Sequence, residues 1–245
     1  MKRNNIILLT AALLLTVLFS SCKKEPEFIG RLWQWDTTIS EFGETDVPFS
    51  VRAIFSSKNT GMLFFVMEIE DEVWGTAIAM PFTYTDNGDK GLLNIDPKSY
   101  YGATSIAWSY NQKAQEMTIQ LGDLAKEFGL TNATIALSEG QMYTYSDLTG
   151  TVWTADMTEV EGESDIFTLS FNDASTALLT DTYTYEGETD KETYKLNYTY
   201  KGGLGDFTYS IFGSTERGGF YLIDQNNMFL SDGMNLLNMK KAADK

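Results

Sequence analysis

Apolar and polar side chains alternate along most of the second half of the chain. From residue 167 to residue 211, every second position in several short runs is aromatic or aliphatic, and the positions between are mostly polar. A period of two predicts β-strands that bury one face and expose the other. The apolar positions are Phe167, Leu169, Phe171, Tyr183, Tyr185, Tyr194, Leu196, Tyr198, Tyr200, Phe207, Tyr209 and Ile211.

Tight-turn residues separate these runs, for example Glu186-Gly187-Glu188, Lys201-Gly202-Gly203 and Asp232-Gly233. Together the runs and turns predict about eight short strands, each joined to the next by a tight turn. Such an antiparallel meander is typical of a sandwich or a closed up-and-down barrel, and closure removes the exposed edges. The bulky aromatic rows predict that a barrel here is filled by its own side chains.

The first half departs from this alternation at two strands that are apolar on both faces, "GMLFFVMEIE" from Gly61 and "VWGTAIAMPF" from Val73. In the first of them Phe64 and Val66 point one way, while Leu63, Phe65, Met67 and Ile69 point the other. A strand covered on both faces packs against something besides its own core. We expect the second half to be that cover; a ligand or another protein is the alternative. Between the halves, residues 123–130 could form two helical turns.

Four short matches between the halves predict an internal repeat. Gly30 and Trp33 match Gly150 and Trp153 at an offset of 120, and "FSSKNTGML" from Phe55 matches "FNDASTALL" from Phe171 at 116. Two further matches follow, at offsets of 114 (Tyr84 with Tyr198) and 111 (Met117 with Met228). A steadily shrinking offset indicates a second copy with shorter loops. We therefore expect β domains at residues 29–149, including a linker, and 150–245. Whether they are separate barrels or one joint sheet system stays open.

The N-terminus reads as a lipoprotein export signal. Lys2 and Arg3 precede an apolar run from Ile6 to Phe19, which is too short to span a bilayer comfortably but suits a secretory signal. Ser20-Ser21-Cys22 follows, with the chain's one cysteine. This resembles the lipobox of bacterial lipoproteins, although Phe19 stands where Leu is usual. The resemblance implies a signal peptide at 1–21, a lipid on Cys22 and a tether at 22–28; the alternative is an ordinary signal peptide.

The residues after the cysteine, Lys23-Lys24-Glu25-Pro26-Glu27, loosely resemble the signal that exports some Bacteroidota lipoproteins to the cell surface. A second Lys and the intervening Pro26 depart from that pattern. We expect an outer-membrane lipoprotein of the cell envelope, held through the acylated Cys22, on either the surface or the periplasmic face.

The composition limits which kinds of binding and catalysis the chain can carry out. Without residues 1–21, basic residues fall from 18 to 16 while acidic ones stay at 34, so the charge goes from −16 to about −18. Such a chain repels nucleic acid. The absence of histidine excludes His-based nucleophilic catalysis and zinc sites. The segment "DNGDKGLLNIDP" from Asp86 does not match the EF-hand calcium-loop pattern, and its first residues are predicted to form a hairpin turn. We expect no enzyme, no metal and no cofactor, although carboxylate counting alone does not exclude a glycosidase-like acid pair.

The opening Gly30-x-x-Trp33 and Gly150-x-x-Trp153, with the later aromatic strands and a closing Asp-Gly, resemble the lipocalin-like domains of Bacteroidota lipoproteins. The spacing is one residue longer than the lipocalin Gly-x-Trp. The resemblance covers residues 29 to about 122 and 150–241, and implies an all-β fold of two tandem antiparallel meander barrels in which both Trp side chains are core plugs.

Two function classes follow. The first is a non-catalytic binding or interaction lipoprotein, with a small apolar molecule or a protein as its partner. The alternative is glycan capture at the cell surface, where Trp35, Trp74, Trp108 and tyrosines would supply a stacking platform. An enclosed apolar cavity would favour the first class, and three or more exposed coplanar rings would favour the second.

Overall fold

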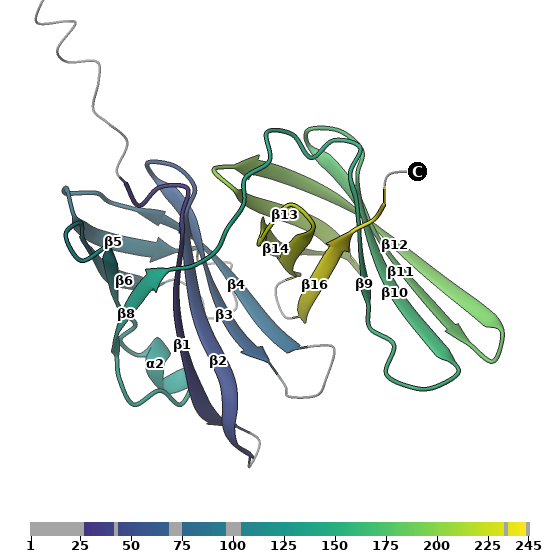
Figure 1. Ribbon diagram of the computed structural model, residues 1–245, viewed down its shortest axis with the longest axis horizontal. Helices are drawn as coiled ribbons and strands as arrows, with labels where there is room; N and C mark the ends of the chain where they lie inside the picture. The colour runs from purple at the N-terminus through teal and green to yellow at the C-terminus, as the bar shows by residue number, and fades with distance from the viewer. Residues whose placement is uncertain (1–26, 42–43, 69–74, 97–103, 233–234, 244–245) are drawn as a thin grey trace, which may run out of the picture.

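The computed structural model is almost entirely β-structure (Figure 1). It describes residues 27–41, 44–68, 75–96, 104–232 and 235–243. The predicted signal peptide, Cys22, most of the tether, Ile69 and Trp74 lie outside these residues. The described part contains one short helix, α2 (Leu124–Glu127), within the segment expected to be helical. No helix among the described residues has the length and apolar character needed to cross a membrane.

The first eight strands form a closed antiparallel barrel. Each strand pairs with the next in the chain, and β8 returns to β1, where Trp33 lies opposite Glu139. This confirms the predicted antiparallel meander for this half. The strands are β1 (Leu32–Glu41), β2 (Glu44–Phe55), β3 (Thr60–Glu68), β4 (Gly75–Tyr84), β5 (Lys90–Ile95), β6 (Ser105–Asn111), β7 (Glu116–Gln120) and β8 (Thr134–Glu139).

The second eight strands also pair in chain order, and β16 lies beside both β15 and β9. A short antiparallel pairing of β16 with β4, at Asn235 opposite Thr76, joins the two halves into one hydrogen-bonded sheet. The strands are β9 (Val152–Asp156), β10 (Glu163–Phe171), β11 (Thr176–Tyr185), β12 (Glu188–Lys201), β13 (Leu204–Ile211), β14 (Ser214–Leu222), β15 (Asn227–Ser231) and β16 (Asn235–Lys241).

Backbone contacts recur in the two halves at the predicted offsets. Gly30 donates its N–H to the carbonyl of Phe55 at 2.8 Å, and Gly150 donates to Phe171 at 2.8 Å. Both glycines have positive φ, +72° and +81°, which residues with a side chain rarely adopt. The equivalent glycines therefore start the first strand of each half in the same way.

A side-chain contact recurs as well. The hydroxyl of Tyr84 donates to the carbonyl of Ser57 at 2.7 Å, and that of Tyr198 donates to the carbonyl of Asp173 at 2.8 Å. The donors are 114 residues apart and the acceptors 116, as the sequence matches require. These repeated contacts support the predicted duplication.

Both motif tryptophans are core residues, as predicted. Trp33 and Trp153 are each 0% exposed. Trp33 Nε1 donates to the carbonyl of Phe28 at 3.2 Å, and Trp153 Nε1 donates to Thr151 Oγ1 at 3.0 Å. Burial of a Trp is favourable when its ring packs and its N–H has a partner, and both conditions hold here.

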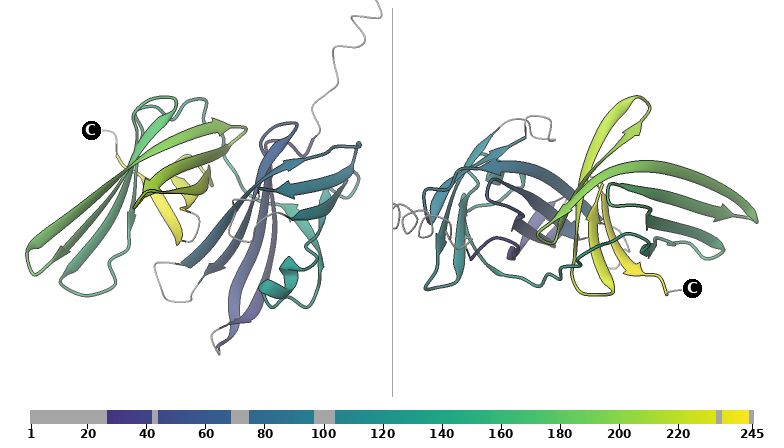
Figure 2. Two further views of the ribbon diagram at one scale, coloured as in Figure 1. Left: turned by 180° about the vertical axis from the view of Figure 1, so that it is seen from behind. Right: turned by 90° about the horizontal axis from the view of Figure 1, so that it is seen from above.

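The doubly apolar strands are covered by the other half, which confirms the predicted interface (Figure 2). Leu63 and Phe65 face the core of the first barrel, while Phe64 and Val66 face outward. A separate apolar cluster, here called the inter-half cluster, joins the outward row to the second half. Its buried members are Leu32, Ile54, Met62, Phe64, Val66, Ala77, Ala79, Leu204, Tyr221, Phe229 and Leu236.

Polar contacts border this cluster. Arg52 Nη1 donates to the hydroxyl of Tyr221 at 2.9 Å. On the second half, Arg217 forms an ion pair with Asp96 of the first half and, at 3.2 Å, with Asp206 of its own half. Buried apolar area with a polar border is typical of a stable interface, so the two halves are held together by packing as well as by the β16–β4 pairing.

Candidate functional site

An aromatic plug closes one end of the first barrel. Phe128 follows α2 in the connection between β7 and β8, and its ring stacks on Phe65 with centroids 4.4 Å apart and planes 5° apart. The ring of Phe49 lies 5.3 Å from that of Phe128. The long β7–β8 connection thus folds over its own barrel end (Figure 1). It adds the Phe128 ring to those of Phe49 on β2 and Phe65 on β3, and the three rings fill this end.

The corresponding end of the second half has a much shorter connection. β15 ends at Ser231 and β16 begins at Asn235. The Asp232 carboxylate accepts from the Asn235 backbone N–H at 2.7 Å and from its side-chain Nδ2 at 2.8 Å. The three residues between the strands, Asp232 to Met234, include no aromatic residue, so this connection supplies no ring like that of Phe128.

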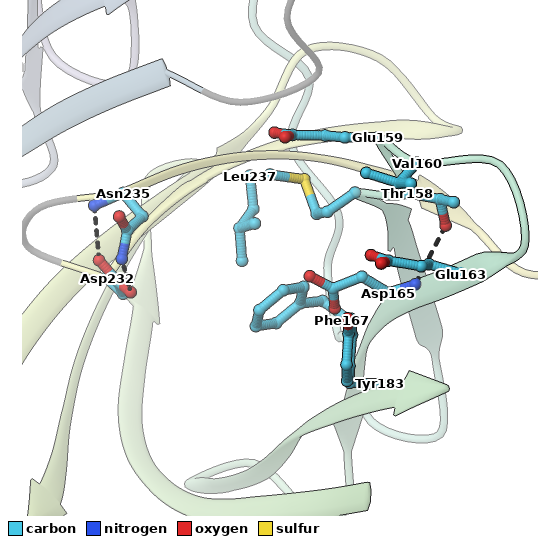
Figure 3. A pocket seen from close by; sticks show the side chains of 11 residues that line it. Thr158, Glu159, Val160, Glu163, Asp165, Phe167, Tyr183, Asp232, Asn235 and Leu237 are labelled. Atoms are coloured by element: carbon cyan, nitrogen blue, oxygen red, sulfur yellow. Dashed lines mark hydrogen bonds between the residues drawn. The ribbon is translucent and has the colours of Figure 1, made fainter. Parts of the chain in front are cut away.

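A cavity of about 360 Å³ lies at this end of the second half. Figure 3 shows Asp165, Phe167 and Tyr183 on one side of it and Asp232 and Asn235 on the other. Ligand sites for small molecules typically start at about 300 Å³ and combine apolar walls with a few polar groups. The remaining lining residues are Met157, Thr158, Glu159, Val160, Glu163 and Leu237.

The prediction of a filled interior holds deeper in this half. Phe171, Tyr198, Phe207 and Phe220 pack together there, with the Phe171 ring 5.0 Å from that of Tyr198. The cavity is therefore confined to the mouth, and none of these four rings is among its lining residues.

Two aspartates replace the two phenylalanines of the plug. Phe49 and Phe65 lie on the inward face of β2 and β3, and at the common offset of 116 the second half carries Asp165 and Asp181. The strand register supports this correspondence. Phe65 lies opposite Val51, and Asp181 lies opposite Phe167, which is the residue at the same offset of 116 from Val51. An apolar plug in one copy is thus a carboxylate pair in the other.

Sequence reasoning missed this pair. The signal was present, because Asp165 and Asp181 interrupt inward rows that are otherwise apolar, such as Phe167, Leu169 and Phe171. A residue-by-residue comparison of the two copies at the offset of 116 would have shown the change from Phe to Asp.

Burial and charge perturb the pair. Partial burial, a hydrogen bond to Asp165 and the negative charge of Asp165 raise the pKa of Asp181 to about 6, with smaller contributions from Glu192 and Asp190. One oxygen of Asp165 and one of Asp181 are shielded from solvent without a hydrogen-bond partner in the described part of the chain. Two carboxyl groups so close favour a state with one proton between them, because ionising both is costly.

The pair should make stability depend on pH, and Asp181→Asn tests this. The folded state binds the Asp181 proton more tightly than the unfolded state, whose pKa is close to 3.8. The protein should therefore lose stability as pH rises from about 4 to about 6, since the unfolded chain gives up this proton first. Thermal melts should show Asp181→Asn to be more stable than the wild type at about pH 7.5 and equal to it at about pH 4.

Glu116→Gln, which removes an exposed charge from the first half, is the control and should show no such pH-dependent difference. A gap between Asp181→Asn and the wild type that is the same at both pH values would contradict the assignment.

Two of the three tryptophans proposed for an aromatic platform lie in described segments, and neither is exposed. Trp108 is buried at 3% exposure, and Trp35 is half-buried against the core of the first barrel. Trp74 and the lipidation residue Cys22 lie outside the described residues. Asp86-Asn87-Gly88-Asp89 forms the hairpin turn between β4 and β5, in which Gly88 N–H donates to Asp86 Oδ1 at 2.7 Å. No group of three metal-ligating side chains gathers in the described part of the protein.

A second hollow of about 380 Å³ lies on the outer face of the first barrel, over β4 to β7, and its lining includes Leu92, Ala107 and Thr118. It is a depression in a sheet surface and carries one charged residue, Lys90. The mouth cavity has the richer chemistry, and it is the candidate site. Comparison with protein-family models, with curated proteins and with solved structures gave no match to this chain.

Proposed function

We propose that this protein is a membrane-anchored lipoprotein of the cell envelope that binds a small molecule without transforming it. The site is the mouth cavity of the second half. One observation carries the proposal: this end is open over about 360 Å³, whereas the equivalent end of the first barrel is filled by Phe49, Phe65 and Phe128.

We further propose that the chain consists of two tandem lipocalin-like barrels. The support is the closure of β1–β8, the return of β16 to β9, and the contacts repeated at Gly30 and Gly150. On this view duplication released one copy from binding, and that copy became a plugged scaffold packed against the other through the inter-half cluster.

A binding role suits the carboxylate pair better than catalysis does. A glycosidase places two carboxyl groups about 5 Å or more apart, with the substrate between them. Asp165 and Asp181 instead interact directly, which leaves no space for a scissile bond between them. Glycan capture, the alternative from the sequence, gains little support from Trp108, which is buried, or from Trp35, which is half-buried against the core of the first barrel.

Filling the mouth should abolish binding. Val160 lines the cavity and is 52% exposed, so Val160→Trp places a large ring over the opening with little cost to the fold. A library of small metabolites, screened by thermal shift and then by calorimetry, should yield ligands of the wild type that no longer bind Val160→Trp. Leu92→Trp on the outer face of the first barrel, where Leu92 is 45% exposed, is the matched control and should bind normally. Ligands that bind all three proteins equally would place the site elsewhere.

The anchor is tested separately. Changing Cys22 to Ala should give a protein without acyl mass that is released from the membrane fraction or retains its signal peptide, because the thiol that carries the lipid is gone. Radiolabelled palmitate in cells expressing wild type and variant measures this directly. Label that persists in Cys22→Ala would disprove lipidation at this residue, and a soluble wild type would disprove the anchor.

A further inference from the structure

We infer that the mouth cavity takes a small amphipathic organic cation, a primary amine whose ammonium group meets Asp165 and whose apolar part lies on Phe167 and Leu237. The inference rests on the proposed binding function and names the class of ligand. It is argued from the walls, the charge and the contrast between the two copies.

The walls divide the cavity into an apolar and an acidic side. Met157, Val160, Phe167 and Leu237 supply carbon surface, which suits a short alkyl or aryl group. Asp165 follows the same inward face of β10 as Phe167 and lies opposite Tyr183 on β11. An ammonium at Asp165 would therefore sit beside a tyrosine ring and a phenylalanine ring, which attract cations through their faces.

The negative charge of the cavity lining argues against anions and neutral apolar molecules as ligands. The acidic lining residues are Glu159, Glu163, Asp165 and Asp232, and no lysine or arginine is among the described residues that line the cavity. An anion would meet like charges with no basic partner, and a neutral apolar ligand would leave the Asp165 carboxylate of the lining without a partner. A cation bonded to Asp165 also relieves the repulsion between this carboxylate and its neighbour Asp181, which does not itself line the cavity.

The copies provide an internal contrast. At equivalent positions the first barrel places Phe49 and Phe65 under Phe128, with no carboxylate in the plug. Open space and half-buried acids thus arise together, in the copy whose connection is short. If the acids were only solvated polar residues, they would be expected on the outward rows, where most charges of this half lie.

Binding should release a proton. In the empty cavity the raised pKa of Asp181, about 6, favours its protonated form below that pH, because the group is partly buried beside Asp165. The groups that face it are Glu163 and Tyr183 beside the cavity, Glu192 and Asp190 on β12, and Tyr194, whose hydroxyl donates to Glu192. None of these is basic, so an arriving ammonium supplies the missing positive charge and displaces the shared proton to solvent.

The test uses three probes of one length, namely n-octylammonium, 1-octanol and octanoate, with the full mature chain in isothermal titration calorimetry. We expect n-octylammonium to bind at least about tenfold more tightly than 1-octanol, the effect of about one charge-assisted hydrogen bond. Octanoate should not bind detectably. Near pH 6, titrations in buffers of different ionisation enthalpy should show proton release on binding, and at about pH 8 release should vanish because Asp181 is already ionised.

Substitutions of Asp165 and Asp181 test whether this pair causes the tighter binding and the proton release. Asp165→Asn and Asp181→Asn should each weaken the binding of n-octylammonium by about tenfold or more and remove the proton release, since one carboxylate is gone. Glu116→Gln also removes one negative charge, but far from the mouth, and should change neither the affinity for n-octylammonium nor the proton release. Each variant is accepted only if its melting curve remains cooperative.

The outcomes separate this inference from the proposed function. If n-octylammonium fails to bind, or binds no more tightly than 1-octanol, the inference is overturned. If 1-octanol or octanoate binds the wild type but not Val160→Trp, the mouth is a ligand site for another chemical class and the proposed function stands. If n-octylammonium binds equally to Asp165→Asn, Asp181→Asn and the wild type, then these two carboxyl groups do not recognise its charge and the inference is wrong.

Discussion

Replacing Trp153 with alanine should remove about 3 to 5 kcal/mol of folding free energy, the usual cost of truncating a fully buried aromatic side chain. Trp153 is 0% exposed and belongs to the core of the second half with Leu169 and Phe171. The substitution opens a cavity and leaves Thr151 Oγ1 without the indole donor at 3.0 Å. Because a domain commonly has only about 5 to 15 kcal/mol in total, this half should be close to unfolding.

Urea denaturation followed by far-ultraviolet circular dichroism measures the loss. Trp35→Ala is the comparison, because Trp35 is also a first-strand tryptophan of its half but is only half-buried at the edge of the core. We expect Trp35→Ala to cost clearly less than Trp153→Ala. Equal and small losses would mean that the Trp of the Gly-x-x-Trp motif does not hold its half of the protein together.

Replacing Phe229 with alanine should uncouple the two halves. Phe229 is 0% exposed and sits in the middle of the inter-half cluster, with its ring 4.9 Å from Tyr221 and 5.2 Å from Phe64. The guanidinium of Arg52 lies 4.8 Å from its centroid. Loss of the ring should cost about 3 to 5 kcal/mol through lost burial and the cavity left behind, and it also removes the aromatic face on which Arg52 rests.

We expect the wild type to unfold in urea as one cooperative unit and Phe229→Ala to unfold in two steps of smaller slope, since each half then exposes its surface separately. Phe212→Ala is the matched control, because Phe212 is a fully exposed residue of the same half, at 105%. If Phe229→Ala keeps a single transition with the wild-type slope, the interface carries no coupling between the halves.

The lipid anchor that we propose at Cys22 would set the context in which the mouth acts. A protein held in this way would stay near the membrane, so a ligand released there would meet it at a high local concentration. The strongly acidic surface adds a field that attracts cations, in the same direction as the acidic lining of the cavity. Both features favour capture of a dilute organic cation, which agrees with the class of ligand inferred for the mouth.

The local pattern by itself determined the strands, the meander and the repeat. Alternation such as Phe167, Leu169 and Phe171 selects one buried face wherever it occurs, because successive side chains of a strand point to opposite sides. The Gly-x-x-Trp motifs predicted the first strand of each half and its buried tryptophan, and these are correct at Trp33 and Trp153. The double apolar rows at Phe64 and Val66 predicted that the second half would cover them, as it does.

Only the tertiary structure decided where a site could lie. Whether Phe49, Phe65 and Phe128 meet depends on the path of a connection between two strands, and no periodicity describes that path. Asp165 and Asp181 are 16 residues apart in the chain, and only the register of β10 against β11 makes them neighbours. Their perturbed chemistry comes from proximity and shielding from water, which are properties of the folded mouth; in the unfolded chain they are two ordinary carboxylates.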